Sequence, residues 1–273
     1  MNRRLHIAAT TLCTALCTLV FLPSPAKADI SSIRSSNSEI WGSVGGSFLN
    51  YKEQLYAPDI PDSEHGWTPT IGAGLDYMTN NNWYFALEGS VSFGDDQYNG
   101  SYYDNNTGYY DIPAQTTTNE TISKVDGKVG KGFALGSHVM LTPYAELGFR
   151  YWDRAIPGNT EDYQNFDMLG GLMFQVAPIN SLILTAYGAA GTTFGAQMKS
   201  SLSGDTYDLG NSGMYKLGGK IAYLFTPRWD VFTALDYDAF RFMQSPVQND
   251  GSYEPSSKTE ETTLRVGIGY HFH

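Results

Sequence analysis

The residues that could do chemistry in this chain are charged side chains in segments where polar and apolar residues alternate. They lie on the small and polar side of the alternation and carry both signs in comparable number. They are Asp76, Glu88, Lys124, Asp126, Lys128, Glu146, Arg150, Asp167, Lys216, Lys220, Asp236, Asp238 and Arg265. Such a set could pair into a stabilising network, or it could line a narrow polar path for ions or small solutes.

A β-strand with one polar and one apolar face would place such residues on the same side, because successive side chains of a strand point to opposite sides. The alternation is clearest in 67–78, 83–93 and 262–272, where Trp, Phe, Leu, Ile or Val alternate with Gly, Ser, Thr or a charged residue. Blocks of about ten residues with this pattern are typical of a transmembrane β-barrel. The apolar side would face lipid, and the charged residues above would point into the lumen.

Ten segments carry the pattern, and ten is an even number, as a single-chain bacterial barrel requires. They are 40–50, 67–78, 83–94, 121–134, 143–153, 164–176, 182–195, 213–225, 229–242 and 261–272. The charges in 121–134 break the alternation there, so an eight-stranded barrel is the alternative. If Phe242 closes the last hairpin opposite Glu261, then Asp238 pairs with Arg265 across the strands.

The connections alternate in length. The short ones are 79–82, 135–142, 177–181 and 226–228, and the long ones are 51–66, 95–120, 154–163, 196–212 and 243–260. Short periplasmic turns and long outer loops are typical of these barrels. Aromatic residues near the strand ends, such as Trp67, Trp83 and Trp229, favour a lipid-facing girdle over the core of a soluble β-sandwich. The sequence therefore predicts an all-β, closed antiparallel transmembrane barrel.

The first residues resemble an export signal. Residues 1–28 begin with Arg3 and Arg4, continue with an apolar run and end in Ala-Lys-Ala, which is typical of a cleaved signal peptide. We expect 29–39 to be a short periplasmic N-terminal extension and 40–273 to form the barrel.

Composition narrows the possible functions. The chain has 273 residues and a formal net charge of −11, with 14% aromatic and 16% charged residues. Many aromatic residues argue against disorder, and the acidic balance argues against a nucleic-acid partner. Both cysteines, Cys13 and Cys17, lie in the expected signal peptide, so no thiol chemistry is expected afterwards. We expect no metal and no cofactor.

The expected outer loop 95–120 is the strongest candidate for binding. It is acidic, lacks Lys and Arg, and is rich in tyrosine: Tyr98, Tyr102, Tyr103, Tyr109 and Tyr110. Tyrosine with Ser, Gly and Asn is the composition of adaptable binding surfaces. A solvated, variable surface loop is the alternative interpretation. We expect contact with an extracellular protein ligand, a structural role in the envelope, or a narrow passive pore.

The last segment, Leu264-Arg-Val-Gly-Ile-Gly-Tyr-His-Phe272, resembles the closing strand of small Gram-negative outer-membrane β-barrels. The segments 143–152 and 229–237 also resemble strands of that group. The resemblance implies insertion by the barrel-assembly machinery, with Ile268, Tyr270 and Phe272 as the assembly signal. It also implies contact with outer-membrane lipid and lipopolysaccharide. His273 follows Phe272, which departs from the group's pattern.

Ten strands are also the number found in the omptin family of outer-membrane proteases. That family uses an Asp pair and an Asp–His pair at the outer rim to activate a water molecule. Here His65 lies in the first outer loop, His138 lies in a periplasmic turn, and Asp95-Asp96 is the acidic doublet of the outer loops. The omptin motifs and the His–Ser motif of lipid A deacylases are not visible, so we predict no catalytic residue.

Overall fold

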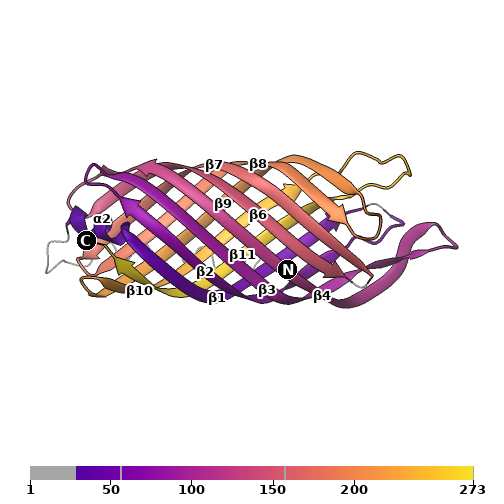
Figure 1. Cartoon of the computed structure of the whole chain (residues 1–273), viewed down its shortest axis with the longest axis horizontal. Coiled ribbons are helices and arrows are strands. Elements are labelled where there is room, and N and C mark those ends of the chain that lie inside the picture. The colour runs from indigo at the N-terminus through magenta and orange to yellow at the C-terminus, as the bar shows by residue number, and fades with distance from the viewer. Residues whose placement is uncertain (1–28, 56, 157, 273) are drawn as a thin grey trace.

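The computed structural model describes residues 29–55, 57–156 and 158–272, and the expected signal peptide, 1–28, lies outside the described residues. Within them the chain forms a closed antiparallel barrel of ten long strands with one very short additional strand and one short helix (Figure 1). No helix among the described residues is long and apolar enough to cross a membrane.

The elements run in this order: α2 (Ile30–Ser36), β1 (Glu39–Gln54), β2 (Ser63–Met78), β3 (Trp83–Asp104), β4 (Tyr109–Lys131), β5 (Phe133–Ala134), β6 (Val139–Ile156), β7 (Asn159–Ile179), β8 (Leu182–Ser200), β9 (Thr206–Thr226), β10 (Trp229–Phe242) and β11 (Ser256–His271).

Each long strand pairs with its neighbours in the chain, and β1 closes the barrel by pairing with β11 from Glu39↔His271 to Gln54↔Ser256. β4 pairs directly with β6, and the two-residue strand β5 pairs only with the start of β6. The prediction of ten strands is confirmed. The eight-stranded alternative is wrong, because 121–134 contributes a full wall strand as part of β4.

The strands extend well beyond the predicted segments at one end of the barrel. The predicted outer loop 95–120 is wrong: β3 and β4 stay paired from Asp95↔Asn119 to Asp104↔Tyr109. The physical reason is that this stretch is rich in Tyr and Thr, which favour strands, and that a ladder of backbone hydrogen bonds can continue past the membrane. The two strands form a hairpin that projects from this end (Figure 1).

The outward-facing side chains of the mid-barrel are apolar and exposed, including Ile71, Leu87 and Val266. We call this surface the apolar belt. It is bordered at the outer end by Phe48 and Trp67, whose ring centroids are 5.5 Å apart. It is bordered at the other end by aromatic residues that include Trp229 and Tyr270, 5.0 Å apart. An exposed apolar band of this kind is stable against lipid and costly against water, so the predicted inside–outside alternation is confirmed.

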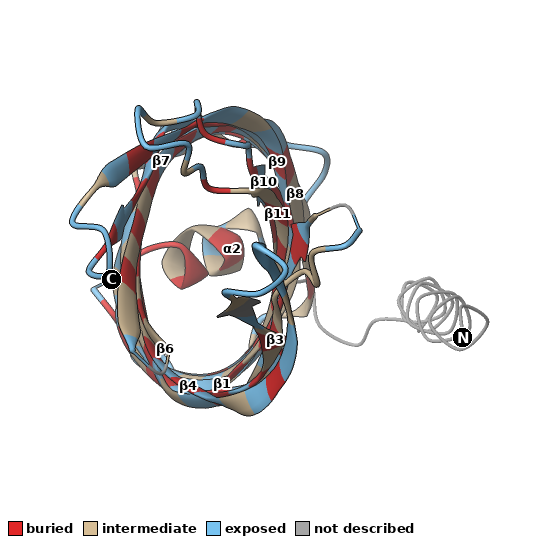
Figure 2. Cartoon of the chain, turned by 90° about the vertical axis from the view of Figure 1, so that its right-hand side faces the viewer, coloured by how far each residue is buried: buried red, intermediate tan, exposed pale blue. Residues whose placement is uncertain are grey.

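The residues expected to form a short N-terminal extension, 29–39, fold into a helix and the first residue of β1. α2 lies inside the outline of the barrel at the end that carries the short turns, which we call the inner end (Figure 2). Ile33 is fully buried there, and the Asn37 amide donates a 2.7 Å hydrogen bond to Gln175 on β7. The helix and the residues after it narrow the inner mouth, and β1 then begins at Glu39.

Candidate functional site

The charged residues predicted to face the lumen do so, and they join opposite walls. Arg150 on β6 donates a 2.5 Å hydrogen bond to Glu261 on β11, and β6 and β11 are five strands apart in either direction round the barrel. Lys124 on β4 joins the same cluster, with its Nζ 3.0 Å from Glu261 and 3.1 Å from Asp238. These side chains cross the lumen at its middle.

A second group surrounds Lys216 on β9. Its ammonium lies 2.8 Å from Asp126, 2.6 Å from Glu146 and 3.6 Å from Asp167, which come from β4, β6 and β7. Lys128 pairs with Glu88 beside it. Every carboxylate of this group therefore has a cation close by, which offsets the cost of burying it.

The third group lies nearer the inner end. Lys220 pairs with Glu39, and Arg265 pairs with Asp236 at 2.8 Å. Asp76 accepts hydrogen bonds from the Trp41 indole at 2.8 Å and from the Tyr84 hydroxyl at 2.6 Å.

The predicted Asp238–Arg265 pair is wrong. Phe242 lies opposite Ser257 rather than Glu261, because β11 begins earlier in the chain than the sequence pattern indicates. This shift puts Arg265 opposite Ala234 and leaves Asp238 for Lys124.

Two small cavities remain between these groups. One holds about 90 Å³ beside Asp76 and Lys220, and the other holds about 50 Å³ beside Ser90 and Asp238. Both are the size of a few water molecules. The cross-barrel pairs and the small cavities favour a network that fills the barrel over a polar path through it.

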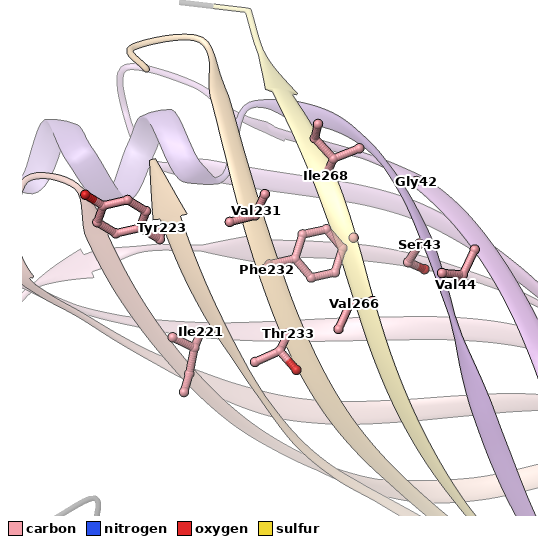
Figure 3. A pocket seen from close by; sticks show the side chains of 11 residues that line it. Gly42, Ser43, Val44, Ile221, Tyr223, Val231, Phe232, Thr233, Val266 and Ile268 are labelled. Carbon is pink, nitrogen blue, oxygen red and sulfur yellow. The ribbon is translucent and has the colours of Figure 1, made fainter. Parts of the chain in front are cut away.

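A wider and more open hollow, of about 780 Å³, lies on the apolar belt over β1, β9, β10 and β11 (Figure 3). Val44, Val266 and Ile268 line it, and Gly42, which has open space where a side chain would stand, adds to its width. Its mostly apolar lining is suited to contact with lipid acyl chains rather than to chemistry.

Beyond the apolar belt the barrel interior holds an outer acidic cluster that the sequence analysis missed: Glu53, Asp62, Glu64, Glu161 and Glu254 around Arg154. Arg154 is fully buried and donates to Glu64 at 2.7 Å and to Glu161 at 2.5 Å. Burial raises the pKa of Asp62 to about 6 and that of Glu254 to about 8. These residues fall in segments that the sequence predicts to be loops. The alternation of 51–54 and 159–163 was the signal that could have placed Glu53 and Glu161 on strands, whereas Asp62 and Glu254 lie in connections.

Asp96 and Glu120 form a buried carboxyl pair next to this cluster. The Trp152 indole donates a 2.9 Å hydrogen bond to Glu120, and burial raises the pKa of Glu120 to about 9 and that of Asp96 to about 6. Asp95 points outward on the same strand, so the acidic doublet is split between the two faces. His65 is also exposed on the outer face, opposite Gln97, and these residues do not assemble the omptin-type arrangement.

The tyrosines of the projecting hairpin have different environments. Tyr98 is buried, and its hydroxyl donates a 2.8 Å hydrogen bond to Asp62, so its prediction as a loop contact is wrong. Tyr102, Tyr109 and Tyr110 are exposed by about half of their surface (51%, 46% and 50%). Tyr103 belongs to β3 opposite Tyr110 in the backbone ladder.

The residues expected to form the assembly signal end the last strand. Ile268 and Phe272 are exposed at the inner end of the apolar belt, and Tyr270 packs edge-on against Trp229. Their role in assembly stays a prediction.

Comparisons with known proteins give a structural likeness only. No protein-family model and no curated protein sequence matches the chain. The outer membrane protease OmpT from Escherichia coli is similar in structure, with a TM-score of 0.62 and 10% identity over 87% of this chain and 98% of that one. The fold is that of a Gram-negative outer-membrane β-barrel.

Neisserial surface protein A also matches, with a TM-score of 0.37 and 12% identity over 85% of this chain and 97% of that one. The attachment invasion locus protein Ail of Yersinia pestis matches with a TM-score of 0.34 and 11% identity, over 86% and 99% of the two chains.

Proposed function

We propose that this protein resides in the outer membrane of a Gram-negative bacterium and presents the projecting hairpin to a partner outside the cell. The observation that carries the proposal is the continuation of β3 and β4 beyond the apolar belt, with Tyr102, Tyr109 and Ile112 exposed near its tip. Exposed aromatic side chains on a paired scaffold offer contact area at a low cost in conformational entropy.

The hairpin is braced rather than free. The Tyr110 backbone amide donates a 2.9 Å hydrogen bond to the Asp59 carboxylate, and the Ile60 amide donates to the Tyr110 carbonyl at 2.9 Å. Ser101 donates to the Ile60 carbonyl at 3.1 Å. Such bracing presents the exposed tyrosines in one arrangement before any partner binds, which reduces the entropy lost on binding.

The charge of the hairpin suggests the partner's chemistry. Residues 95–120 contain neither Lys nor Arg, and three of their five acidic residues, Asp95, Asp104 and Asp111, are not buried. A negative surface attracts cationic partners and repels anionic ones, so a basic protein surface fits the hairpin better than unbridged lipopolysaccharide.

A passive pore is the less favoured function, because the Arg150–Glu261 pair and its neighbours cross the lumen. An outer-rim hydrolase would need a catalytic group that the split of Asp95 and Asp96 does not supply.

Attachment of whole cells tests the proposal. Cells of a non-adherent Gram-negative strain that display the protein should attach to surfaces coated with a basic protein. Replacing residues 102–112 by Asn-Gly should abolish attachment while preserving the ladder, because Ser101 and Pro113 are already cross-strand partners and a two-residue turn can join them.

The matched control replaces residues 249–251, in the β10–β11 connection, by the same Asn-Gly turn. Folding of each variant is checked by the change in its gel mobility on boiling. Equal attachment by the hairpin variant and the wild type would refute the proposed role of the hairpin.

A further inference from the structure

Three potential metal ligands converge at the inner end of the barrel, beside α2. Glu39 begins β1, Asp230 lies at the start of β10 and His271 ends β11, and the side chains of all three are fully buried. One donor atom from each lies within 4.8 Å of the others. We call these residues the seam triad, because Glu39 and His271 are partners where β1 closes onto β11.

Most polar atoms of the seam triad have no hydrogen-bond partner. These are Oε2 of Glu39, both carboxylate oxygens of Asp230, and Nε2 of His271. Leaving buried polar atoms unpaired is costly, and more so for charged groups, so this arrangement needs a further partner.

The other carboxylate group of the barrel shows the contrast. Asp126, Glu146 and Asp167 also converge, but the Lys216 ammonium lies within 3.6 Å of all three. In the seam triad Lys220 hydrogen-bonds only Oε1 of Glu39. In the first group one ammonium therefore lies close to all three carboxylates, whereas in the seam triad the ammonium hydrogen-bonds one carboxylate oxygen and leaves both oxygens of Asp230 without a hydrogen-bond partner.

The histidine is oriented as a metal ligand would be. Its Nδ1 lies 2.8 Å from the Ser35 carbonyl oxygen and donates to it, which leaves the lone pair of Nε2 directed at the two carboxylates. Nε2 is 3.3 Å from Asp230 Oδ2 and 3.9 Å from Glu39 Oε2. Ligands about 2.1 Å from a tetrahedral zinc ion are about 3.4 Å apart, so small side-chain movements would suffice.

A glycine makes room for this arrangement. A Cβ atom on Gly269 would overlap Glu39 Oε2 and would lie 2.7 Å from Asp230 Oδ1. The two carboxylates therefore occupy the space that any other residue at 269 would fill.

We propose that Glu39, Asp230 and His271 form a binding site for a divalent first-row metal ion, such as Zn²⁺ or Mn²⁺. One imidazole and two carboxylates are a ligand set for such ions, and a +2 charge would neutralise the two carboxylates. The ion would tie β1, β10 and β11 together at the closure of the barrel. Through Ser35 it would also hold the end of α2.

Titration with the metal alone tests the site. Full-length protein without a polyhistidine tag is extracted from membranes, stripped with EDTA and titrated calorimetrically with Zn²⁺, then with Mn²⁺. Saturable binding of one ion per chain is expected for at least one of the two. Asp230→Asn and His271→Gln should each weaken it more than about tenfold. His138→Gln, which removes an exposed histidine, is the matched control and should bind like the wild type.

A second pair of variants keeps all three ligands. Gly269→Ala should weaken binding by displacing the carboxylates, whereas Gly42→Ala on the neighbouring strand has open space around the added Cβ and should not. Every variant is first shown to fold by its heat-modifiable mobility.

A thermal measurement provides an independent readout. Zn²⁺ should raise the unfolding temperature of the wild type and leave that of His271→Gln unchanged, because a ligand that binds only the folded state stabilises it. Absence of one-site binding by the wild type would overturn the proposal. Unchanged binding by Asp230→Asn would also overturn it, and would instead favour a protonated His271 paired with Asp230.

Discussion

Arg154 is the residue on which the outer acidic cluster depends. It is the cation at the centre of five carboxylates, with Glu64 and Glu161 directly hydrogen-bonded, and its guanidinium carbon lies 4.9 Å from the centre of the Tyr51 ring. A buried ion pair adds little to the stability of the fold compared with apolar packing. Removing one partner is costly, however, because it leaves a buried charge without compensation.

Arg154→Ala should therefore lower the free energy of unfolding by about 3–5 kcal/mol. Urea unfolding in lipid vesicles, followed by tryptophan fluorescence, measures the change. Arg241→Ala removes an exposed arginine from β10 and should cost less than about 0.5 kcal/mol. A similar small loss for both variants would contradict the role given to Arg154.

The raised pKa values of the outer acids predict a loss of stability with rising pH. The folded protein holds protons on Asp62, Glu254 and Glu120 up to pKa values of about 6, about 8 and about 9, whereas the ordinary values are 3.8, 4.5 and 4.5. Their favourable contribution is complete below the ordinary values and is lost as pH rises through the folded ones.

Amide hydrogen exchange, corrected for its intrinsic pH dependence, should show weaker protection of the outer halves of β3, β4 and β6 at pH 9 than at pH 5. Glu120→Gln mimics the protonated acid and should reduce this difference. Equal protection at pH 5 and pH 9 would contradict the predicted link between the protonation of these acids and stability.

Among the elements, the strands of the mid-barrel restrict residue type most strongly, because each strand has one face toward lipid and one toward the charged lumen. Leu87 is exposed on the apolar belt, whereas Ser90 on the same strand lines a small inner cavity. The two faces should therefore respond differently to a polar substitution.

Leu87→Lys should destabilise the folded barrel by about 2–4 kcal/mol, the cost of a lysine at mid-membrane. Ser90→Asn adds a polar group inside and should cost less than about 1 kcal/mol. Equilibrium refolding into vesicles gives both values. Equal costs would contradict the assignment of the two faces.

The strands were predictable from sequence where lipid imposes alternation, and unpredictable where it does not. Leu75, Leu87 and Val266 revealed the belt because each alternates with a small or polar neighbour. Beyond the membrane the outward face meets water instead of lipid, so polar residues occupy both faces and the alternation weakens. Tyr98 and Glu161 therefore seemed to belong to loops. The Asp238–Arg265 error has a related cause, because hairpin register depends on a loop that carries no alternation.

At the scale of the whole molecule, the lumen is filled by side chains that meet from opposite walls, with α2 across the inner mouth. Purified protein in a planar bilayer should therefore carry no steady current. Replacing Arg150, Lys124 and Glu261 by alanine removes the central crossing and should produce one, provided that boiling still shifts the variant's gel mobility. A steady current from the wild type would favour the pore.

The ladder between β1 and β11 has a consequence for biosynthesis. The two strands of this ladder are separated by nearly the whole described chain. The barrel can therefore close only after β11 has been made. A ribosome-stalled or truncated product would keep two unpaired strand edges, which lipid does not tolerate. Such a product would stay outside the bilayer and be exposed to proteases, so closure would act as a checkpoint that admits only chains with an intact last strand.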